Sequence, residues 1–334
     1  MRLGILFAGG NSLRDIVTVG HRAEAAGFDS LYMVEAYRSA WIALTALAGV
    51  TTRVQLGPYV ANAYARSPLI TGMTAVDFNE YANGRLVLGV GGGNRIINEE
   101  WQGIPHARVL TKLREYVEIL QRIARTPAGQ PLIYNGKVHR TAWTPVIAPT
   151  PTPYPVYLAA VFPAMLRVAA TVADGIAGGA TLSPRYLREE LLPRAARCAM
   201  EVDRDPGSLR WRAVMFTAVS ADRTEARRAV RAALCNLFAP LPHPYYEYTM
   251  REQGFGPVVE RLRELVPAGR SDAAIDAIPD ALIDTLTIAG TPAECRARID
   301  EYAGLVEELI LLNAMPTPVG DPVAAFDDLL LLAR

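Results

Sequence analysis

The sequence has few of the residues that hold metal ions or cross-link chains. Its 334 residues include three cysteines and four histidines. Cys198, Cys235 and Cys295 are far apart and form none of the close pairs that zinc sites and redox motifs need. The histidines include no pair at i,i+4 spacing and no carboxylate at ligand spacing. We therefore expect no bound metal ion, buried cysteines and a reducing, cytoplasmic location.

The sequence also lacks an excess of either charge and any long apolar run. Thirty-four basic residues balance thirty-four acidic ones, so the chain has no net field to hold a nucleic acid or an anionic membrane surface. No stretch reaches the roughly 18 uninterrupted apolar residues of a transmembrane helix, and the start of the chain has no signal-peptide core. We expect neither a nucleic-acid partner nor a membrane. The 51% hydrophobic content suffices for one large core.

Short apolar runs alternate with amphipathic segments along most of the chain. The runs are continuous rather than alternating, which is typical of strands covered on both faces. They predict eight strands, each followed by a helix; the strands are expected at 3–7, 30–34, 53–57, 86–90, 156–160, 175–177, 212–219 and 309–312, and the helices at 16–26, 41–48, 69–81, 113–123, 163–173, 186–202, 224–238 and 323–332.

Eight such units can close into a (β/α)8 barrel or remain an open, doubly wound sheet. The length favours the barrel, and the glycine pattern of a dinucleotide-binding sheet is missing after the first strand. We predict a single α/β domain over residues 1–334, a (β/α)8 TIM barrel. Two segments break the rhythm and are expected to be insertions, one at about 127–155 with at most a hairpin and one at about 240–280 that is irregular or helical.

The active site of such a barrel lies at the carboxyl ends of its strands. The residues there are mostly small, as in Gly91-Gly92-Gly93 after the fourth strand and in Gly178-Gly179 after the sixth. A glycine triplet lets a flat or phosphorylated ligand approach the backbone, or it simply makes a tight turn. Ala160-Val161 leads into a helix whose free amides could face an anion, or it is an ordinary helix start.

Ionisable groups are scarce at these strand ends. Glu35, after the second strand, could be a general base if it is desolvated, or it could pair with an arginine. No Gly-x-Ser-x-Gly motif is present, which argues against a serine hydrolase. The pattern favours a site that binds something planar and leaves the chemistry to a cofactor.

Several motifs, in this order and spacing, resemble one known family. The chain is similar over nearly its whole length to the luciferase-like flavin and deazaflavin oxidoreductases, particularly the F420-dependent branch related to methylenetetrahydromethanopterin reductase. The resemblance rests on AEAAGFDSLY at 23–32, LGPYVANAYARSP at 56–68, NGRLVLGVGGG at 83–93, REYVEIL at 114–120, VADG at 172–175, IAGTPAEC at 288–295 and ELIL at 308–311.

The resemblance implies a cofactor seat and places residues in it. A bulge after the third strand, with a cis peptide bond between Tyr59 and Val60, would press against the middle of a tricyclic ring. Asn62 and the loop from Gly91 to Gly93 would line that ring. The cofactor phosphate would be faced by the backbone amides of Ala160, Val161, Gly178 and Gly179. A polyglutamate tail of the cofactor would need a basic group at the rim, and Arg185 is the residue expected there.

The resemblance also implies the chemistry. Glu35 and Tyr37 fall where relatives place side chains that face the substrate. We predict a coenzyme F420-dependent oxidoreductase that transfers a hydride between the deazaflavin C5 and a small organic substrate, and a homodimer, as is common among relatives. An FMN-dependent monooxygenase is the alternative within the family, and a non-catalytic ligand-binding relative is the alternative outside it. Leu6-Phe7 and Asn94 replace acidic residues of the methanopterin reductases, which argues against a folate-like substrate.

Overall fold

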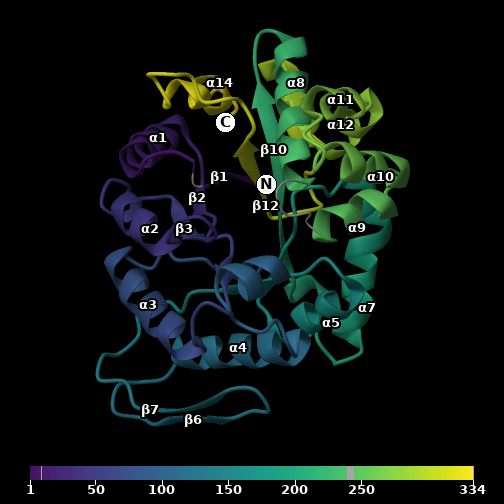
Figure 1. The fold of residues 1–334 in the computed structure, drawn as a ribbon. Helices are drawn as coiled ribbons and strands as arrows, with labels where there is room; N and C mark the ends of the chain where they lie inside the picture. Colours follow the sequence, from purple (N-terminus) through teal and green to yellow (C-terminus); the bar gives the residue numbers. More distant parts are fainter. Residues whose placement is uncertain (9, 239–243, 334) are drawn as a thin grey trace.

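The chain folds around one large parallel sheet with helices on its outside (Figure 1). The computed structural model describes residues 1–8, 10–238 and 244–333. The start of the insertion expected at 240–280 therefore lies partly outside the described residues. The strands of this sheet are β1 (Arg2–Phe7), β2 (Ser30–Met33), β3 (Gln55–Pro58), β4 (Ala61–Asn62), β5 (Leu88–Gly91), β8 (Val156–Ala159), β9 (Gly175–Ala177), β10 (Arg210–Val219), β11 (Ile288–Gly290) and β12 (Glu308–Asn313).

The sheet closes into a barrel. Its strands follow the order β3-β2-β1-β12-β10-β9-β8-β5-β4, and a parallel bridge between Leu56 and Leu86 joins the two ends. The gap is narrow there, because a Cβ at Gly57 would lie 1.7 Å from the Val87 carbonyl oxygen. Glycine at that position lets the chains approach closely enough to close the ring. The predicted (β/α)8 TIM barrel is confirmed.

Two strand predictions need correction at this seam. The fourth strand was expected at 86–90, but regular pairing begins at Leu88, and Leu86 takes part only through the isolated bridge. The third strand breaks after Pro58, and the short β4 then pairs with β5. The break is the bulge that carries residues 59 and 60, where the candidate site begins.

Most expected helices are present on the outside of the barrel. A capping box of Ser12 and Asp15 starts the first of them, and Gly27 ends it in the left-handed conformation. These helices are α1 (Leu13–Ala26), α2 (Ala40–Ala48), α3 (Pro68–Tyr81), α4 (Val109–Ile123), α5 (Pro163–Val172), α7 (Leu192–Met200) and α8 (Arg223–Cys235).

Two helices differ from their predictions. The helix expected at 186–202 is divided into α6 (Pro184–Tyr186), a π-helical turn (Leu187–Leu191) and α7. The one expected at 323–332 is a 3-10 turn (Ala324–Phe326) followed by the short α14 (Asp327–Leu330). A further π-helical turn, Ile97–Trp101, lies in the loop after β5, and 3-10 turns occur at Pro206–Ser208 and Asn236–Phe238.

The two insertions have different structures. The first carries the expected hairpin, formed by β6 (Leu132–Asn135) and β7 (Arg140–Trp143), which stands apart from the barrel in Figure 1. The second is helical, and the sequence did not predict the strand β11 that follows it and pairs with β10. Its helices are α9 (Pro244–Glu252), α10 (Gly256–Leu265), α11 (Ser271–Asp276) and α12 (Asp280–Leu286), and α13 (Pro292–Asp300) follows β11.

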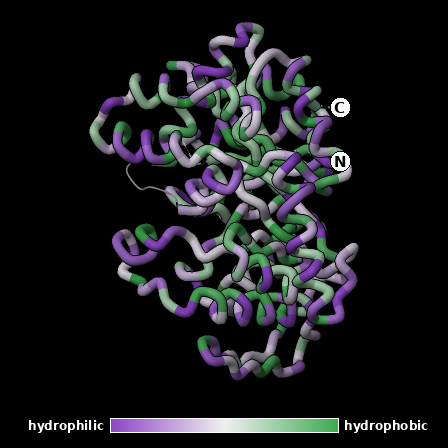
Figure 2. Tube along the Cα trace, turned by 90° about the vertical axis from the view of Figure 1, so that its right-hand side faces the viewer, coloured by the Kyte–Doolittle hydropathy of each residue, from purple (hydrophilic) through white to green (hydrophobic). Residues whose placement is uncertain are grey.

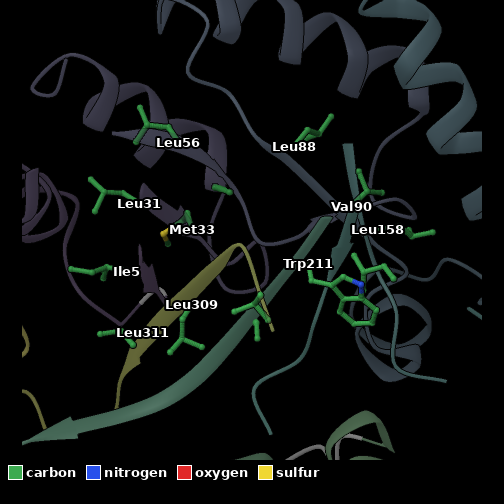
Figure 3. Close-up of a cluster of buried hydrophobic side chains, with 14 of the residues drawn as sticks. Ile5, Leu31, Met33, Leu56, Leu88, Val90, Leu158, Trp211, Leu309 and Leu311 are labelled. Carbon is green, nitrogen blue, oxygen red and sulfur yellow. The ribbon is translucent and has the colours of Figure 1, made fainter. Parts of the chain in front are cut away.

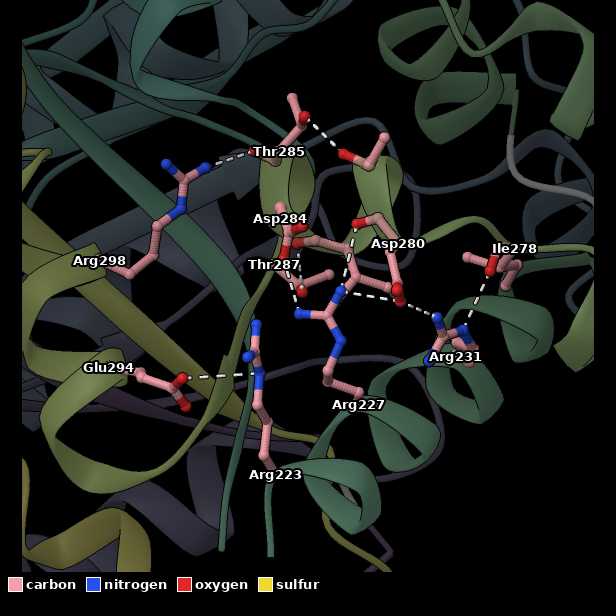
Figure 4. A network of polar contacts seen from close by, with 12 residues as sticks. Arg223, Arg227, Arg231, Ile278, Asp280, Asp284, Thr285, Thr287, Glu294 and Arg298 are labelled. Carbon is pink, nitrogen blue, oxygen red and sulfur yellow. Dashed lines mark hydrogen bonds and ion pairs between the residues drawn. The ribbon is translucent and has the colours of Figure 1, made fainter.

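Ion pairs attach the second insertion to the barrel helix α8 (Figure 4). Arg227 of α8 reaches Asp280 and Asp284 of α12 at 2.8 and 2.6 Å. Arg231, one turn further along α8, also pairs with Asp280. The aspartates are exposed while Arg227 is buried, and together these ion pairs hold α12 against α8.

Apolar side chains fill the space between the sheet and the helices. Figure 3 shows Ile5, Leu31, Met33, Leu309 and Leu311 from neighbouring strands, all of them buried in this layer. Figure 2 shows apolar segments running through the middle of the molecule, with hydrophilic segments toward its outside. This layer holds the strands in a fixed order and so fixes the positions of their carboxyl ends.

The amino end of the barrel is closed by a buried ionic cluster. Arg212 of β10 pairs with Glu308 of β12 at 2.7 Å, and both are almost fully buried. Glu308 also accepts hydrogen bonds from the hydroxyls of Ser30 and Tyr32. Burial raises the pKa of Glu308, while the Arg212 guanidinium opposes that rise. These groups plug the end of the barrel opposite the candidate site, where residues serve stability.

Candidate functional site

The bulge after β3 brings Tyr59 and Val60 to the mouth of the barrel. Their peptide bond is cis, which confirms the predicted geometry. The Tyr59 side chain points into the barrel, where its hydroxyl donates to the Gly178 carbonyl at 2.9 Å and its ring meets Tyr32 edge-on. Burial raises the pKa of Tyr59, so its phenol stays neutral. The Val60 side chain is half-buried and is the part of the bulge that lies at the mouth of the barrel.

The Gly91–Gly93 loop lies beside Val60. A Cβ at Gly91 would be 2.5 Å from Val60 Cγ2. All three carbonyls of the loop are held: Ala63 N–H donates to that of Gly91 at 2.9 Å, Asn98 Nδ2 to that of Gly92 at 2.7 Å, and the Tyr245 hydroxyl to that of Gly93 at 2.7 Å. The loop is therefore fixed in position by three different segments.

Asn62 and Glu35 meet at the edge of this loop. The buried Asn62 accepts from Tyr64 N–H at 2.9 Å through Oδ1, and its own N–H donates to Glu35 Oε2 at 3.2 Å. Burial is the largest influence on Glu35 and raises its pKa, while the Asn62 N–H bond and the charge of Arg66 act in the opposite direction. Glu35 is thus a half-buried carboxyl at a strand end whose proton affinity exceeds that of an exposed glutamate.

The residues expected to face a phosphate lie next to the glycine loop, after the neighbouring strands β8 and β9. Helix α5 begins at Pro163, and its N-cap Phe162 supplies no side-chain acceptor to the first amides. A Cβ at Gly179 would lie 3.9 Å from Val161 Cγ2, so the two loops adjoin. Ala160, just before them, is buried. Gly178 differs from the expectation, because its N–H already donates to the Arg212 carbonyl at 2.8 Å.

Helix α9 reaches the mouth from the second insertion. Tyr245 binds the glycine loop, and its ring contacts Phe162 at a centroid distance of 5.6 Å. Tyr246 packs in the same cluster as Tyr59 and Val60, and its Cε1 lies 4.0 Å from a Cβ placed on Gly179. The aromatic run from 245 to 248 is the only signal in the sequence that could have pointed to this role.

Two predicted residues lie outside this group. Tyr37 is 73% exposed and packs against the Trp101 ring, at a centroid distance of 5.6 Å. Arg185 is exposed on α6, beside the end of α9, where Ser183 N–H donates to Gln253. Neither has a contact with Val60 or with the glycine loop among the interactions of the described residues.

Two polar residues behind the loop, Asn98 and His106, were not predicted from the sequence. Asn98, on the π-helical turn, is fully buried and bonds Asn62, Gly92 and His106. These contacts join residues 36 and 8 positions apart, and no local motif marks them.

Within the described part of the chain, no three histidine, cysteine, aspartate or glutamate side chains come together as a metal site, and the three cysteines are free and buried. No helix of the described segments is long and apolar enough to cross a membrane.

Comparison with known proteins places this geometry in context. The family model for luciferase-like monooxygenases matches residues 1–307. A 5,10-methylenetetrahydromethanopterin reductase of Archaeoglobus fulgidus is 28% identical over 308 residues, which cover 91% of this chain and 90% of the reductase. A putative coenzyme F420-dependent oxidoreductase of Mycobacterium tuberculosis is 29% identical over 292 residues, 80% of this chain and 81% of that protein.

Solved structures agree on the fold. The coenzyme F420-dependent tetrahydromethanopterin reductase from Methanopyrus kandleri superimposes with a TM-score of 0.84. The match covers 98% of this chain and 97% of the reductase at 22% sequence identity. At that identity the likeness concerns the barrel and its insertions rather than the substrate.

Proposed function

Since this chain belongs to the luciferase-like monooxygenase family and is an oxidoreductase, we propose that it uses coenzyme F420 to transfer a hydride to or from a small organic substrate. The observation that carries the proposal is the mouth of the barrel, where Val60 and the glycine loop form a surface of small residues with few ionisable groups. Relatives named as F420-dependent support the choice of cofactor.

The residues present fit a flat tricyclic ring. Val60 would press on the ring from below, and Asn62 with the Gly91–Gly93 loop would border its edge. Every carbonyl of that loop already has a donor, so the loop would keep its shape when a ligand binds. The uncapped start of α5, with Val161 and Gly179, would face the phosphate. The bound deazaflavin supplies the hydride chemistry at its C5.

The protein's own part is positioning and the exclusion of water. Tyr245 and Tyr246 of α9 would cover the ring, and Phe162 supports Tyr245 from the α5 side. Glu35, with its raised pKa, is the group at the mouth best suited to hold or move a proton. Tyr37 would act only at the entrance, because its side chain is exposed, and Arg185 would act only on a long acidic tail.

The substrate is proposed to be smaller than tetrahydromethanopterin. Asn94 stands after the glycine loop where the methanopterin reductases carry an acidic residue. It is 4% exposed, and its Oδ1 accepts from Ile96 N–H at 2.9 Å. The side chain therefore starts the following turn instead of presenting a charge at the mouth.

An FMN-dependent monooxygenase is a second candidate, which the name of the matching family favours. The two are separated by titrating the purified protein with F420 and with FMN and following fluorescence. We expect F420 to bind more tightly, and tight binding of FMN without F420 would overturn our choice. Stopped-flow measurement of cofactor reduction by candidate small organic substrates then tests turnover.

We also propose that the protein is a homodimer that pairs through helices α2 and α3. Ile42 is 62% exposed and Tyr81 is 56% exposed, although both are large and apolar. They line a surface groove with Val50 and with residues of α2. Helix α2 is apolar on nearly every side, which is unusual for a helix with one face in solvent.

A further inference from the structure

A buried relay of side chains supports the glycine loop from behind. It runs from Asn62 at β4 through Asn98 on the π-helical turn to His106 in the loop before α4. Asn62 Nδ2 donates to Asn98 Oδ1 at 2.8 Å, and Asn98 Nδ2 lies 2.7 Å from the Gly92 carbonyl and 2.9 Å from His106 Nδ1. Asn98 is fully buried, so its amide has to find all its partners within the protein.

The backbone fixes the orientation of both amides. Tyr64 N–H can only donate, so the Asn62 side-chain atom that faces it is the oxygen. Asn62 therefore presents its NH₂ to Asn98, and Asn98 has to answer with its oxygen. The NH₂ group of Asn98 then carries two hydrogens, one directed to the Gly92 carbonyl and one to His106.

This order of donors leaves His106 a single protonation state. Its Nδ1 faces an NH₂ group and has to accept, so the ring is neutral and carries its hydrogen on Nε2. A protonated imidazole would present a second donor to Asn98. Rotating the Asn98 amide would not relieve that clash without breaking the bonds to Gly92 and Asn62.

We propose that neutral His106 is a positioning residue for the cofactor seat, which orients Asn98 so that Asn98 holds the Gly92 carbonyl, and that protonation of His106 releases the loop and weakens cofactor binding. The inference rests on the proposed function, because it takes the Gly91–Gly93 loop as part of the seat. His106 is not itself placed in contact with cofactor or substrate.

The surroundings of His106 favour its neutral form. Its ring stacks on Tyr64 at a centroid distance of 4.7 Å, and the Lys112 ammonium lies 4.7 Å from the centroid of that same Tyr64 ring. Glu99 accepts from the His106 backbone N–H at 3.1 Å and is neutralised by Arg95 at 2.8 Å. Burial lowers the pKa of His106; the charge of Glu99 raises it and that of Arg95 lowers it further.

The sign of the pH effect follows from that direction. A histidine whose folded pKa lies below its ordinary value of about 6.5 is neutral at neutral pH and takes up a proton only in acid. Neutral His106 therefore holds the Asn98 amide, and through it the loop, at any pH above about 6.5. This support is lost as the pH falls through the lowered pKa of His106. Cofactor affinity should fall over the same range.

The first test measures the protonation state of His106 in the absence of cofactor. Long-range ¹⁵N–¹H spectra of the protein labelled at its histidine rings show which ring nitrogen of His106 is protonated. We expect the hydrogen on Nε2 at pH 7.5 and protonation only at acid pH. A hydrogen on Nδ1 at pH 7.5 would overturn the relay, even if every variant failed to fold.

The second test measures the dissociation constants of F420 and FMN between pH 5 and pH 8. In the wild type we expect the dissociation constant to rise by about tenfold toward pH 5, the size expected for one buried hydrogen bond. His106→Gln keeps an acceptor for Asn98 but cannot titrate, so its profile should be flatter. His139→Gln, in the hairpin turn, is the matched control because burial also lowers the pKa of His139.

The outcomes separate this proposal from the proposed function. Identical pH profiles for the wild type and His106→Gln, with binding intact, overturn the role of His106 alone. Failure of both cofactors to bind the wild type at any pH overturns the proposed function and the binding role of His106 together. In that case the spectrum still decides whether the relay exists.

Discussion

At the scale of single residues, the space beside Val60 decides what can bind. A Cβ at Gly91 would meet Val60 Cγ2 at 2.5 Å and Ala159 Cβ at 3.3 Å. Gly91→Ala should therefore push Val60 into the seat, with a stability loss of about 1–3 kcal/mol and roughly tenfold weaker cofactor binding. Fluorescence titration and thermal unfolding check the two effects.

A matched substitution separates the clash from a general effect of losing glycine. Gly256→Ala on α10 adds the same methyl group where the nearest atom is 3.9 Å away, so it should leave cofactor affinity unchanged and should not lower stability. Val60→Ala in the Gly91→Ala background should restore part of the affinity, because the two side chains compete for one space. Unchanged affinity in Gly91→Ala would remove this loop from the seat.

Glu35 permits a prediction about pH. Burial raises its pKa, so the folded protein favours the protonated carboxyl and ionisation at neutral pH costs stability. Glu35→Gln should keep the bond from Asn62 N–H and should melt at or above the wild-type temperature at pH 7.5. The gain should vanish near pH 4, where Glu35 is protonated in both states.

The same variant tests a catalytic role. If Glu35 moves a proton, the rate of cofactor reduction in the wild type should depend on a group titrating above the ordinary glutamate value, and Glu35→Gln should lose that dependence. Cofactor affinity should change less than about threefold, since the hydrogen bond is retained. An unchanged pH profile together with full activity would assign Glu35 a structural role only.

The site residues differ in how well the sequence could place them. The cis bond at Tyr59–Val60 follows from a family motif that is continuous in the chain, and it was predicted. Asn98 and His106 were missed because their contacts depend on how the loop after β5 folds back. For Gly178, the sequence could not show that the Arg212 carbonyl already accepts from its N–H.

At the scale of helices and strands, apolar runs located the barrel strands because both faces of each strand are buried. They failed where another influence was stronger. The seam between β3 and β5 is set by the close approach at Gly57, and β11 is only three residues long and lies beyond the barrel. The position of α9 over the mouth depends on Tyr245 and Phe162, which are far apart in the sequence.

The buried pair between β10 and β12 gives a prediction at this scale. Arg212→Met leaves Glu308 buried without its cation, which should cost about 3–5 kcal/mol of unfolding free energy at pH 8. The loss should shrink toward pH 5.5, because the pKa of Glu308 is already raised by burial and would rise further, so that the carboxyl takes up a proton. Guanidinium unfolding at the two pH values measures both numbers.

Two comparisons make that result specific to burial. Arg212→Met combined with Glu308→Gln should recover most of the loss, since the fully buried carboxylate is gone and Glu307, the other partner of Arg212, still pairs with Arg2. Arg22→Met removes the surface pair with Asp327, which joins α1 to α14, and should cost no more than about 1 kcal/mol. Equal losses for Arg212→Met and Arg22→Met would show that the plug contributes no more than a surface ion pair.

At the scale of the whole molecule, the apolar groove over α2 and α3 makes the assembly testable. Ile42 is 62% exposed on α2, and an aspartate there would place a charge in the middle of the proposed interface. Ile42→Asp should convert the dimer to a monomer over the micromolar range, as measured by light scattering after gel filtration, while the far-ultraviolet circular dichroism stays the same. Ile133→Asp, on the hairpin and 61% exposed, carries the same change outside the groove and should remain dimeric.

Because α2 and α3 flank the strands that lead to Glu35 and to the Tyr59–Val60 bulge, pairing should steady those strand ends, and the monomer should bind cofactor less tightly. A monomeric wild type, or a dimer that survives Ile42→Asp, would contradict this interface, whereas full affinity in a monomeric variant would show that each barrel binds its cofactor alone.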